Sequence, residues 1–262
     1  MSRQLLLCID GGNTNVVFAL FEGEMILSQW RLSTDLKRTA DEYGVWLTNL
    51  LNLNGFKVDE IKAASIANVV PQISFQLREL SQRYFHCTPL CVESYEDVDI
   101  SVLIDNPTEV GADRLVNAVA AHHKYPGWLI VIDFGTATTL DVVRNDGAYV
   151  GGVIAPGVNL SLDALGRAAA RLPPISIKKP KKVLGQGTVS AMQSGVFWGY
   201  VSLIEGLVSR IKSELGQDAT VVATGGLASL FHDSCGVINA IDDDLTLKGL
   251  QLVYEIDGVS AK

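Results

Sequence analysis

The sequence contains one short pattern twice, and this repeat is the feature that most constrains the fold. The segment IDGGNTNVVFALF (residues 9–21) joins two apolar runs through an aspartate, two glycines and three small polar residues. The segment IDFGTATTLD (residues 132–141) repeats the arrangement, and Asp133 lies 123 residues after Asp10. Both copies are followed by a turn and a third apolar run. The repeat predicts an internal duplication of a unit about half the chain long.

The rest of the sequence is typical of an α/β protein. After each predicted hairpin, segments with apolar residues at helical spacing alternate with short apolar runs. We expect two domains, residues 1–125 and 126–262, that meet near the turn at residues 125–127. The expected helices include residues 39–53, 159–171, 188–215 and 245–254. Three glycines within the third of these helices, Gly195, Gly199 and Gly206, predict that it packs closely against a neighbour.

Composition limits the classes of partner that the chain can attract. Hydrophobic residues make up 48% of the 262 residues, and the net charge is −8 (21 basic minus 29 acidic). An acidic chain has no general attraction to nucleic acid or anionic lipid, so we expect neither, and we interpret the basic run Lys178–Lys182 as a solvated loop. No apolar run approaches the ~20 residues that span a bilayer, and we expect a cytoplasmic protein. The four scattered cysteines favour free thiols over a zinc site.

The two polar turns are candidate anion sites. Consecutive small residues at the tip of a strand can point several backbone N–H groups into one concavity, and glycine lets a phosphate approach the main chain. Asn13, Thr14 and Asn15 add side-chain donors, and Asp10 can hold magnesium directly or through water. A polar β-turn without a ligand is the alternative. The second copy and a third glycine turn at residues 224–226 argue against it.

Other phosphate-binding and hydrolase signatures are absent from the sequence. It contains no GxxxxGK[ST] loop, no GxGxxG spacing after a strand and no GxSxG elbow. Phosphate binding by paired hairpin turns is therefore the interpretation that remains.

These residues resemble those of the actin-like, sugar-kinase-like ATPases, whose two duplicated domains hold ATP between such turns. Five motifs follow the order found in type III pantothenate kinases: DGGNTN (10–15), NPTEVGADR (106–114), DFGTATT (133–139), GGVIAPG (151–157) and GTVSAMQSGVFWGY (187–200). The resemblance implies two ribonuclease-H-like α/β domains, each with a mixed central sheet flanked by helices. It also implies ATP-dependent phosphorylation of pantothenate to 4′-phosphopantothenate, the first step of coenzyme A synthesis.

The same resemblance implies roles for particular residues. The expected ATP-binding residues are Asp10, Gly11, Gly12, Asn13, Thr14, Asn15, Val16, Val17 and Thr136. The expected substrate-binding residues are Ile104, Gly111, Ala112, Asp113, Arg114 and Thr188. Asp133 resembles the ligand of a monovalent cation, potassium or ammonium, on which these enzymes depend. The family also implies a homodimer with the substrate site near the interface.

The resemblance also implies that Asp113 is the catalytic residue, as the proton acceptor, and the chemistry of the reaction agrees with this role. Phosphoryl transfer depends mostly on positioning and charge stabilisation, with one carboxylate placed to take the hydroxyl proton. Asp113 lies where a helix is expected to begin, and the helix dipole favours its ionised form. A simple capping role is the alternative for Asp113 and for Thr188. Arg114 could stabilise the transferring phosphate, hold a carboxylate or form a surface ion pair, and its role stays open.

One position departs from the family pattern. Members usually carry a substrate-contacting tyrosine seven residues before the glycine of the GADR segment, and this chain has Ile104 there. A kinase for a different small-molecule acceptor is therefore one alternative function. A catalytically weak, nucleotide-responsive regulatory protein is another. The intact Asp10, Asp113 and Asp133 argue against the second alternative, because a pure binding module needs no base.

Overall fold

The computed structural model describes residues 3–168, 173 and 175–260, which divide into two compact units. Unit 1 contains the residues up to Ala120 together with those from Leu245 onward, and unit 2 contains Ala121–Asp244. The chain leaves unit 1 within helix α3 (Ala112–Lys124) and re-enters it with helix α7 (Leu245–Ser260). The units differ from the predicted domains 1–125 and 126–262 mainly in α7, which belongs with the N-terminal half. None of the helices in these residues is long and apolar enough to cross a membrane.

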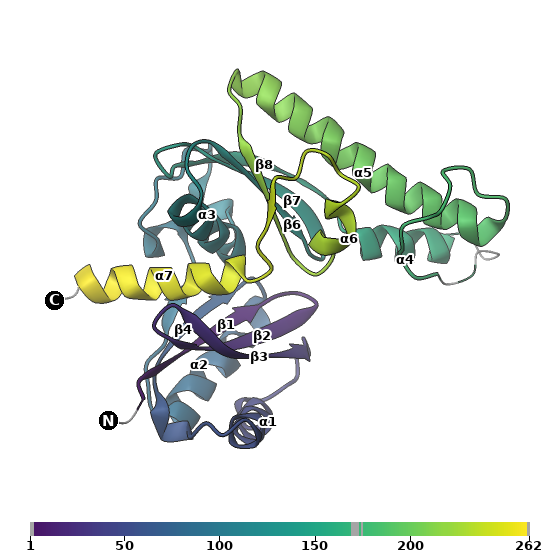
Figure 1. The fold of residues 1–262 in the computed structure, drawn as a ribbon. Coiled ribbons are helices and arrows are strands. Elements are labelled where there is room, and N and C mark those ends of the chain that lie inside the picture. Colours follow the sequence, from purple (N-terminus) through teal and green to yellow (C-terminus); the bar gives the residue numbers. More distant parts are fainter. Residues whose placement is uncertain (1–2, 169–172, 174, 261–262) are drawn as a thin grey trace. The chain divides into compact units, whose positions relative to one another are not determined.

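Unit 1 is built on a five-stranded sheet in the order β3-β2-β1-β4-β5 (Figure 1). Its strands are β1 (Leu5–Gly11), β2 (Asn15–Glu22), β3 (Met25–Ser33), β4 (Ile61–Asn68) and β5 (Leu90–Val92). Its other elements are α1 (Ala40–Leu53), α2 (Pro71–Phe85), the start of α3, α7, and the short 3-10 helices η1 (Val58–Glu60), η2 (Tyr95–Asp97) and η3 (Pro107–Glu109). The pairs β1–β2 and β2–β3 are antiparallel, whereas β1, β4 and β5 run parallel. The first three strands are the predicted hairpin set.

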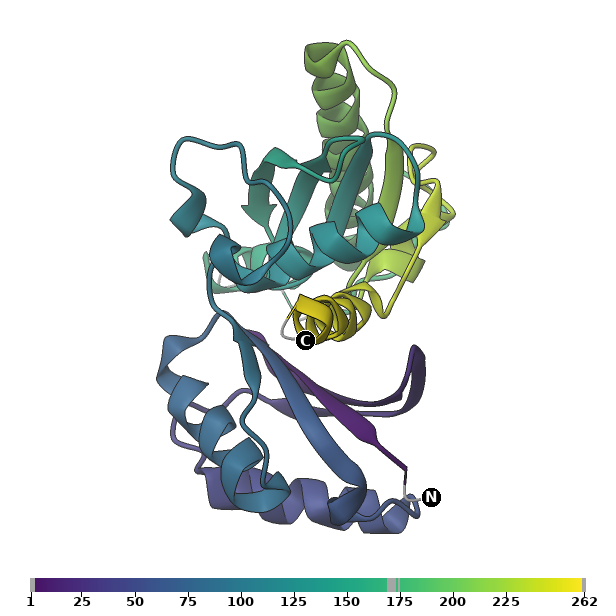
Figure 2. The same ribbon diagram turned by 90° about the vertical axis from the view of Figure 1, so that its left-hand side faces the viewer.

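Both faces of this sheet are covered by helices. Along β1, the alternate residues Leu5, Leu7 and Ile9 pack in one core with apolar side chains of α1 and α2. On the other face, Ser65 of β4 donates a hydrogen bond to the carbonyl oxygen of Leu250 in α7 (3.1 Å). Figures 1 and 2 show α1 and α2 on one side of the sheet and α7 on the other. A strand buried on both faces must be apolar throughout, as β1 is until its last two residues.

Unit 2 repeats this arrangement. Its strands are β6 (Leu129–Phe134), β7 (Ala137–Val143), β8 (Tyr149–Pro156), β9 (Thr220–Thr224) and β10 (Ala240–Ile241). They lie in the order β10-β9-β6-β7-β8, so β6 takes the place of β1, and the strand directions are the same as in unit 1. Its helices are the end of α3, α4 (Val158–Ala168), α5 (Thr188–Leu215) and α6 (Ala228–His232). The equivalence confirms the duplication and the α/β class that the sequence predicts.

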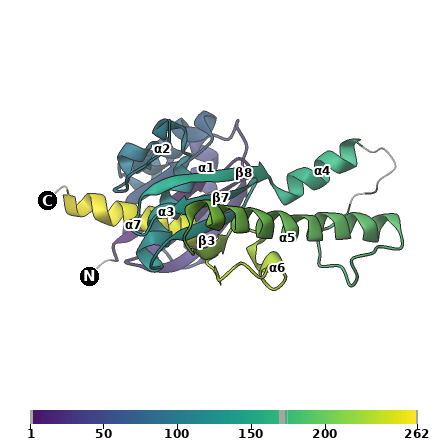
Figure 3. The ribbon, with the colours of Figure 1, turned by 90° about the horizontal axis from the view of Figure 1, so that it is seen from above.

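An aromatic cluster joins the helices of unit 2 to its sheet. The ring of Phe231 in α6 stacks on Phe134 of β6 and on Phe197 of α5, with ring centroids 5.2 Å apart in each pair. The apolar side chains of Ile130 and Ile132 complete this core from the sheet. Figure 3 shows the long helix α5 with α4 beside it. Helices α5 and α6 are thereby fixed on one face of the second sheet.

Most of the predicted helices are present, with adjusted ends. The helix predicted over residues 39–53 is α1, and Thr39 is its N-cap, with reciprocal hydrogen bonds to Glu42 of 2.8 and 3.3 Å. The helix predicted over residues 188–215 is α5, with the same ends. The last helix extends beyond residue 254 to Ser260. The helix predicted over residues 159–171 begins one residue earlier as α4, and residues 169–171 lie outside the described residues.

The prediction that the glycines of α5 mark close packing is wrong within this chain. Among the described residues, a Cβ at Gly195 or Gly199 would meet no atom within 4 Å. A Cβ at Gly206 would meet the flexible end of Arg210, at 3.1 Å. Close packing occurs instead in α7, where a Cβ at Gly249 would lie only 2.1 Å from the carbonyl oxygen of Val116 in α3.

This contact predicts the effect of alanine at residue 249. At an open helical position, alanine stabilises a protein by about 1 kcal/mol relative to glycine. In Gly249→Ala the new methyl group would press on a backbone carbonyl that cannot move aside. We expect a net loss of about 1–3 kcal/mol, measured as a lower urea midpoint. Gly206→Ala is the matched control and is expected to keep or raise the midpoint. A raised midpoint in Gly249→Ala would contradict the packing of α7 on α3.

Candidate active site

Three carbonyl oxygens of the loop between β1 and β2 accept hydrogen bonds from neighbouring segments. The carbonyl of Gly11 accepts the N–H of Val69, just after β4 (3.0 Å). Thr34, the first residue after β3, donates twice: its Oγ1 to the carbonyl of Gly12 (2.6 Å) and its N–H to the carbonyl of Thr14 (3.0 Å). The C=O and N–H groups of a trans peptide point in opposite directions. Holding the Gly12 carbonyl toward Thr34 therefore turns the Asn13 N–H the other way, as the binding of an anion to this loop requires, whereas the Gly12 N–H donates to the carbonyl of Asn15 (3.0 Å).

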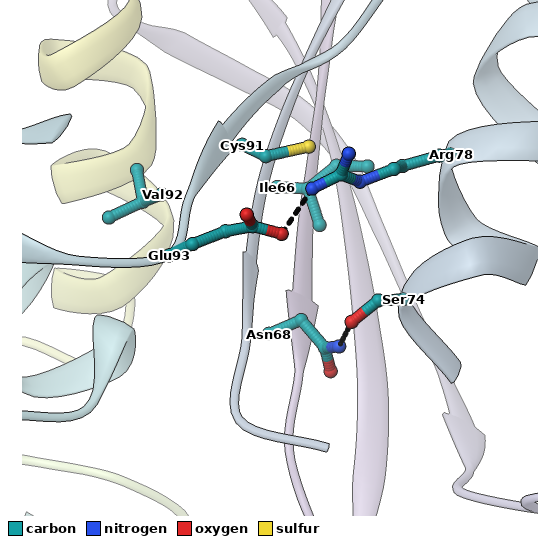
Figure 4. Close-up of a pocket in the computed structure, with 7 residues that line it drawn as sticks. All are labelled: Ile66, Asn68, Ser74, Arg78, Cys91, Val92 and Glu93. Atoms are coloured by element: carbon teal, nitrogen blue, oxygen red, sulfur yellow. Dashed lines mark hydrogen bonds and ion pairs between the residues drawn. The ribbon is translucent and has the colours of Figure 1, made fainter. Parts of the chain in front are cut away.

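The end of β4 lies directly against this loop. A Cβ at Gly11 would lie 2.4 Å from Oδ1 of Asn68, so the position has no room for a side chain. The Asn68 amide is itself held in place: its Nδ2 donates to the carbonyl of Val70 (2.8 Å) and to Oγ of Ser74 (2.7 Å), and its Oδ1 accepts the Val70 N–H (3.0 Å). Figure 4 shows Asn68 reaching Ser74 in the first turn of α2. The first glycine of the DGG motif, Gly11, is therefore required, because the side chain of Asn68 at the end of β4 occupies the space that a side chain at residue 11 would need.

The small pocket behind Asn68 is not part of the candidate site. It is lined by Ile66, Asn68, Ser74, Arg78, Cys91, Val92 and Glu93 (Figure 4). Arg78 forms an ion pair with Glu93 there, and burial raises the pKa of the nearby Cys91 thiol. A volume of about 10 Å³ holds no more than a single water molecule. The pocket is therefore too small for a nucleotide or an organic substrate.

The first turn of α3 lies beside the same strand end. The carbonyl of Gly111 accepts the N–H groups of Arg114 (3.1 Å) and Leu115 (3.2 Å), so the helix begins immediately after this glycine. A Cβ at Gly111 would lie 2.6 Å from Oδ1 of Asp113 and 3.5 Å from Cγ1 of Val69. Val69 therefore borders both the β1–β2 loop and the GADR segment. The two motifs meet at one edge of unit 1.

Asp113 lies inside the first turn of α3 and not at its cap. The helix begins at Ala112, and Oδ1 of Asp113 accepts the N–H of Arg114 (2.8 Å). The capping alternative for Asp113 is therefore wrong. A half-buried carboxylate in the first turn of a helix is favoured in its ionised form by the helix dipole. This is the state that a proton acceptor needs.

The equivalent turn of unit 2 follows β6. Asp133 pairs with Thr224 across β6 and β9, and the following Gly225 has φ +88°, with its Cβ position 2.5 Å from Oδ1 of Asp133. Gly157, the first residue after β8, donates its N–H to the carbonyl of Thr136 (3.1 Å). A Cβ at Gly157 would lie 2.2 Å from the same oxygen. Three glycine-containing motifs, at residues 133–139, 151–157 and 224–226, thus meet at one edge of the second sheet.

Helix α5 supports this edge at one point and carries a predicted substrate residue at its start. The hydroxyl of Tyr200 donates to the carbonyl of Pro156 (2.8 Å) and shares a hydrogen bond with Oγ of Ser161 (2.6 Å). Thr188 is the exposed first residue of α5, and Gly187 occupies the cap position. The capping alternative for Thr188 is therefore wrong. Figure 3 shows one end of α5 extending beyond the strands, beside α4.

The remaining predicted residues fall at the same edge of unit 1 or in its loops. Asp10 is the next-to-last residue of β1 and is half-buried. Ile104 is half-buried in the bend before η3, and Arg114 is half-buried in the first turn of α3. Sequence reasoning missed Thr34, Asn68 and Tyr200, whose hydrogen bonds hold the loops in place. The available signal was that Thr34 and Asn68 each lie near the end of an apolar run in the sequence.

The described residues contain no cluster of three or more His, Cys, Asp or Glu side chains that could hold a metal ion. Asp10 would supply a single carboxylate to a divalent ion. This fits Mg²⁺, which usually binds one or two carboxylates together with water and substrate phosphates. Burial raises the pKa of all four cysteine thiols, that of Cys235 to about 11, which disfavours the nucleophilic thiolate form.

Comparison with solved structures identifies the fold. The inorganic polyphosphate/ATP-glucomannokinase of Arthrobacter sp. strain KM matches with a TM-score of 0.53, over 97% of this chain and all of that chain, at 9% sequence identity. The two equivalent sheets, each with an aspartate–glycine turn after its central strand, define a protein of the actin-like, sugar-kinase-like ATPase fold.

Comparison with other sequences narrows the class to one family. The family model described as type III pantothenate kinase matches residues 6–210. The type III pantothenate kinase of Paramagnetospirillum magneticum is 61% identical over 251 residues, which cover 95% of this chain and 96% of that protein. That of Phenylobacterium zucineum is 55% identical over 250 residues, covering 95% and 97%. The chain belongs to the type III pantothenate kinase family.

Proposed function

We propose that the protein transfers the γ-phosphoryl group of ATP to the hydroxyl group of pantothenate, forming 4′-phosphopantothenate for coenzyme A synthesis. The observation that carries this proposal is the nearly full-length identity to type III pantothenate kinases. The geometry of unit 1 supports it, because the end of β1 and Gly111, the glycine of the GADR segment, border the same residue, Val69. A phosphate-binding loop and a base belong close together in a kinase.

The β1–β2 loop would hold the phosphates of ATP. Its carbonyl oxygens at Gly11, Gly12 and Thr14 accept hydrogen bonds from Val69 and Thr34. These partially negative oxygens therefore point toward the protein and do not repel a bound phosphate. Asp10, at the end of β1, would hold Mg²⁺ directly or through water. When bound, the ion would neutralise charge on the phosphate oxygens. The Thr136 turn of unit 2 is the proposed second contact to ATP.

Asp113 would act as the base. In the proposed step the pantothenate hydroxyl oxygen forms a bond to the γ-phosphorus, and the bond from that phosphorus to the β,γ-bridging oxygen breaks to release ADP. Asp113 takes the hydroxyl proton. The proposed substrate contacts in unit 1 are Gly111, Ala112 and Arg114 of the same helix start, together with Ile104. Thr188 is the proposed substrate contact in unit 2. An apolar side chain at residue 104 offers packing where the family tyrosine offers an aromatic contact.

Asp133 would bind a monovalent cation, potassium or ammonium. The turn around it is rich in oxygen donors, because the carbonyls of Gly135 and Thr136 lie within 2.6 Å of the Cβ position of Gly157. Carboxylate and carbonyl oxygens are the ligands that a hard monovalent cation accepts. We further propose that the enzyme works in the cytoplasm, where its co-substrate ATP is abundant.

The most direct test of the reaction is ADP release with and without pantothenate, in buffer that contains magnesium and potassium. We expect ADP release to depend on pantothenate and on both cations. Replacing potassium by sodium is the control for the monovalent site. Absence of pantothenate-stimulated turnover would contradict the proposed function, and stimulation by a different alcohol would indicate another acceptor.

The role of Asp113 predicts a separation of turnover from binding. Asp113→Asn keeps the shape of the side chain but removes the proton acceptor, so kcat should fall by about 100-fold or more. The KM for ATP should change little, because the β1–β2 loop is untouched. Asp59→Asn, at an exposed position in η1, is the matched control with normal turnover. Equal loss of turnover and nucleotide binding would mean that Asp113 is structural.

A homodimer is also proposed, with the exposed glycines of α5 in the interface. A Cβ at Gly195 or Gly199 would meet open space among the described residues of this chain, so a second copy could approach the helix backbone closely.

This proposal predicts that Gly199→Leu dissociates the dimer without unfolding the chain. Leucine fits the open space of a single copy and favours the helix over glycine by up to about 1 kcal/mol. Sedimentation velocity should therefore show a dimer for the native protein and a monomer for the variant. Asn52→Leu, at an exposed position of α1, is the control that should remain dimeric. A dimeric Gly199→Leu protein, or a monomeric native protein, would contradict the proposal.

A further inference from the structure

Thr34 is the residue that connects the end of β3 to the β1–β2 loop. It is half-buried, and it lies outside the segments that the family resemblance assigns to ATP or substrate. Its N–H and its hydroxyl donate to two different carbonyls of the loop, Thr14 O at 3.0 Å and Gly12 O at 2.6 Å. One residue therefore fixes two peptide groups of the same turn.

Only one of these two bonds is repeated in unit 2. Gly157 follows β8 as Thr34 follows β3, and its N–H donates to Thr136 O (3.1 Å) as the Thr34 N–H donates to Thr14 O. A side chain cannot occur at Gly157, because its Cβ would lie 2.2 Å from that carbonyl oxygen. The backbone hydrogen bond is therefore common to both copies of the duplicated unit. The hydroxyl bond to Gly12 is an addition in unit 1 alone.

The hydroxyl bond fixes the peptide group between Gly12 and Asn13. Because C=O and N–H point in opposite directions across a trans peptide, holding Gly12 O toward Thr34 points the Asn13 N–H away from β3. Asn13 is exposed at the tip of the loop. Glycine has wide backbone freedom, so without the hydroxyl this peptide could rotate and present its carbonyl oxygen in place of the N–H. A carbonyl dipole at that place would repel a phosphate.

We infer that Thr34 is a positioning residue for ATP, whose hydroxyl group holds the Gly12–Asn13 peptide with its N–H toward the nucleotide phosphates. This inference rests on the proposed role of the β1–β2 loop in binding ATP. Thr34 acts through the loop and does not itself touch the nucleotide. It therefore affects ATP more than pantothenate.

The test compares Thr34→Val with Thr34→Ser. Valine keeps the β-branched shape and removes the hydroxyl donor, whereas serine keeps the donor. For Thr34→Val we expect the KM for ATP to rise about tenfold, the effect of losing about one hydrogen bond, while the KM for pantothenate stays within about twofold. Thr34→Ser should restore the KM for ATP to near the native value. Thr39→Val is the control, because Thr39 caps α1 and its loss lowers stability without contact to the loop.

A second measurement separates this inference from the proposed reaction. Equilibrium titration with a non-hydrolysable ATP analogue, in the absence of pantothenate, should give about tenfold weaker binding for Thr34→Val than for the native protein or Thr34→Ser. Native protein that binds the analogue without phosphorylating pantothenate would overturn the proposed function and leave this comparison valid. Equal analogue affinities in all three proteins, or parallel losses in Thr34→Val and Thr39→Val, would overturn the role of Thr34. Native protein that binds no analogue would overturn both.

Discussion

The orientation of the peptide groups between β1 and β2 is the constraint on which the candidate site of unit 1 depends. A backbone loop attracts an anion only when its N–H groups point outward, and each outward N–H requires that the carbonyl of the same peptide points inward. The protein meets this requirement at the Gly12–Asn13 peptide with the hydroxyl of Thr34 after β3, while Val69 after β4 holds the preceding peptide, whose N–H donates to the carbonyl of Asn15. The neighbouring strand ends therefore set the conformation of the loop. The main contribution of the loop's own sequence is its glycines, which leave room for these contacts.

The duplicated fold places similar turns at the edges of two sheets, but the turns differ in detail. In unit 1 the first glycine is closed in by Asn68, and Thr34 supplies both a backbone and a hydroxyl donor. In unit 2 the turn is closed in by the backbone of Gly157, and Gly225 passes over Asp133. These differences fit two different proposed tasks, phosphate binding in the first copy and cation binding in the second. The duplication gives both units the same arrangement of strands, and a few residues at the strand ends make the two turns different.

Features that depend on local sequence could be predicted, and features that depend on distant contacts could not. The two aspartate–glycine turns and the ends of α5 follow from local patterns of apolar residues and glycine. The membership of α7 in unit 1 could not be read from its sequence, since it depends on contacts with β4 and α3 that are distant along the chain. The open space at Gly195 and Gly199 within this chain could not be predicted, because a glycine in a helix does not reveal which neighbour approaches it.

In the candidate site, too, residues marked by a local sequence pattern could be predicted, and residues that act through distant contacts could not. The aspartates and glycines of the two turns were found because their spacing is repeated, and Asp113 because the GADR segment resembles a motif of the family. Thr34 and Asn68 were missed, because a threonine or asparagine after a strand is also an ordinary turn residue. Only the three-dimensional register of β1, β3 and β4 identifies what their side chains contact.

The central claim is that the outward Asn13 N–H of the β1–β2 loop receives a phosphate of ATP. The most direct measurement is the backbone amide spectrum of isotope-labelled protein during titration with a non-hydrolysable ATP analogue and magnesium. The account predicts that the Asn13 amide signal moves with the added analogue and that its proton shifts downfield as it forms a hydrogen bond. Saturation by the analogue with the Asn13 signal unchanged would contradict it.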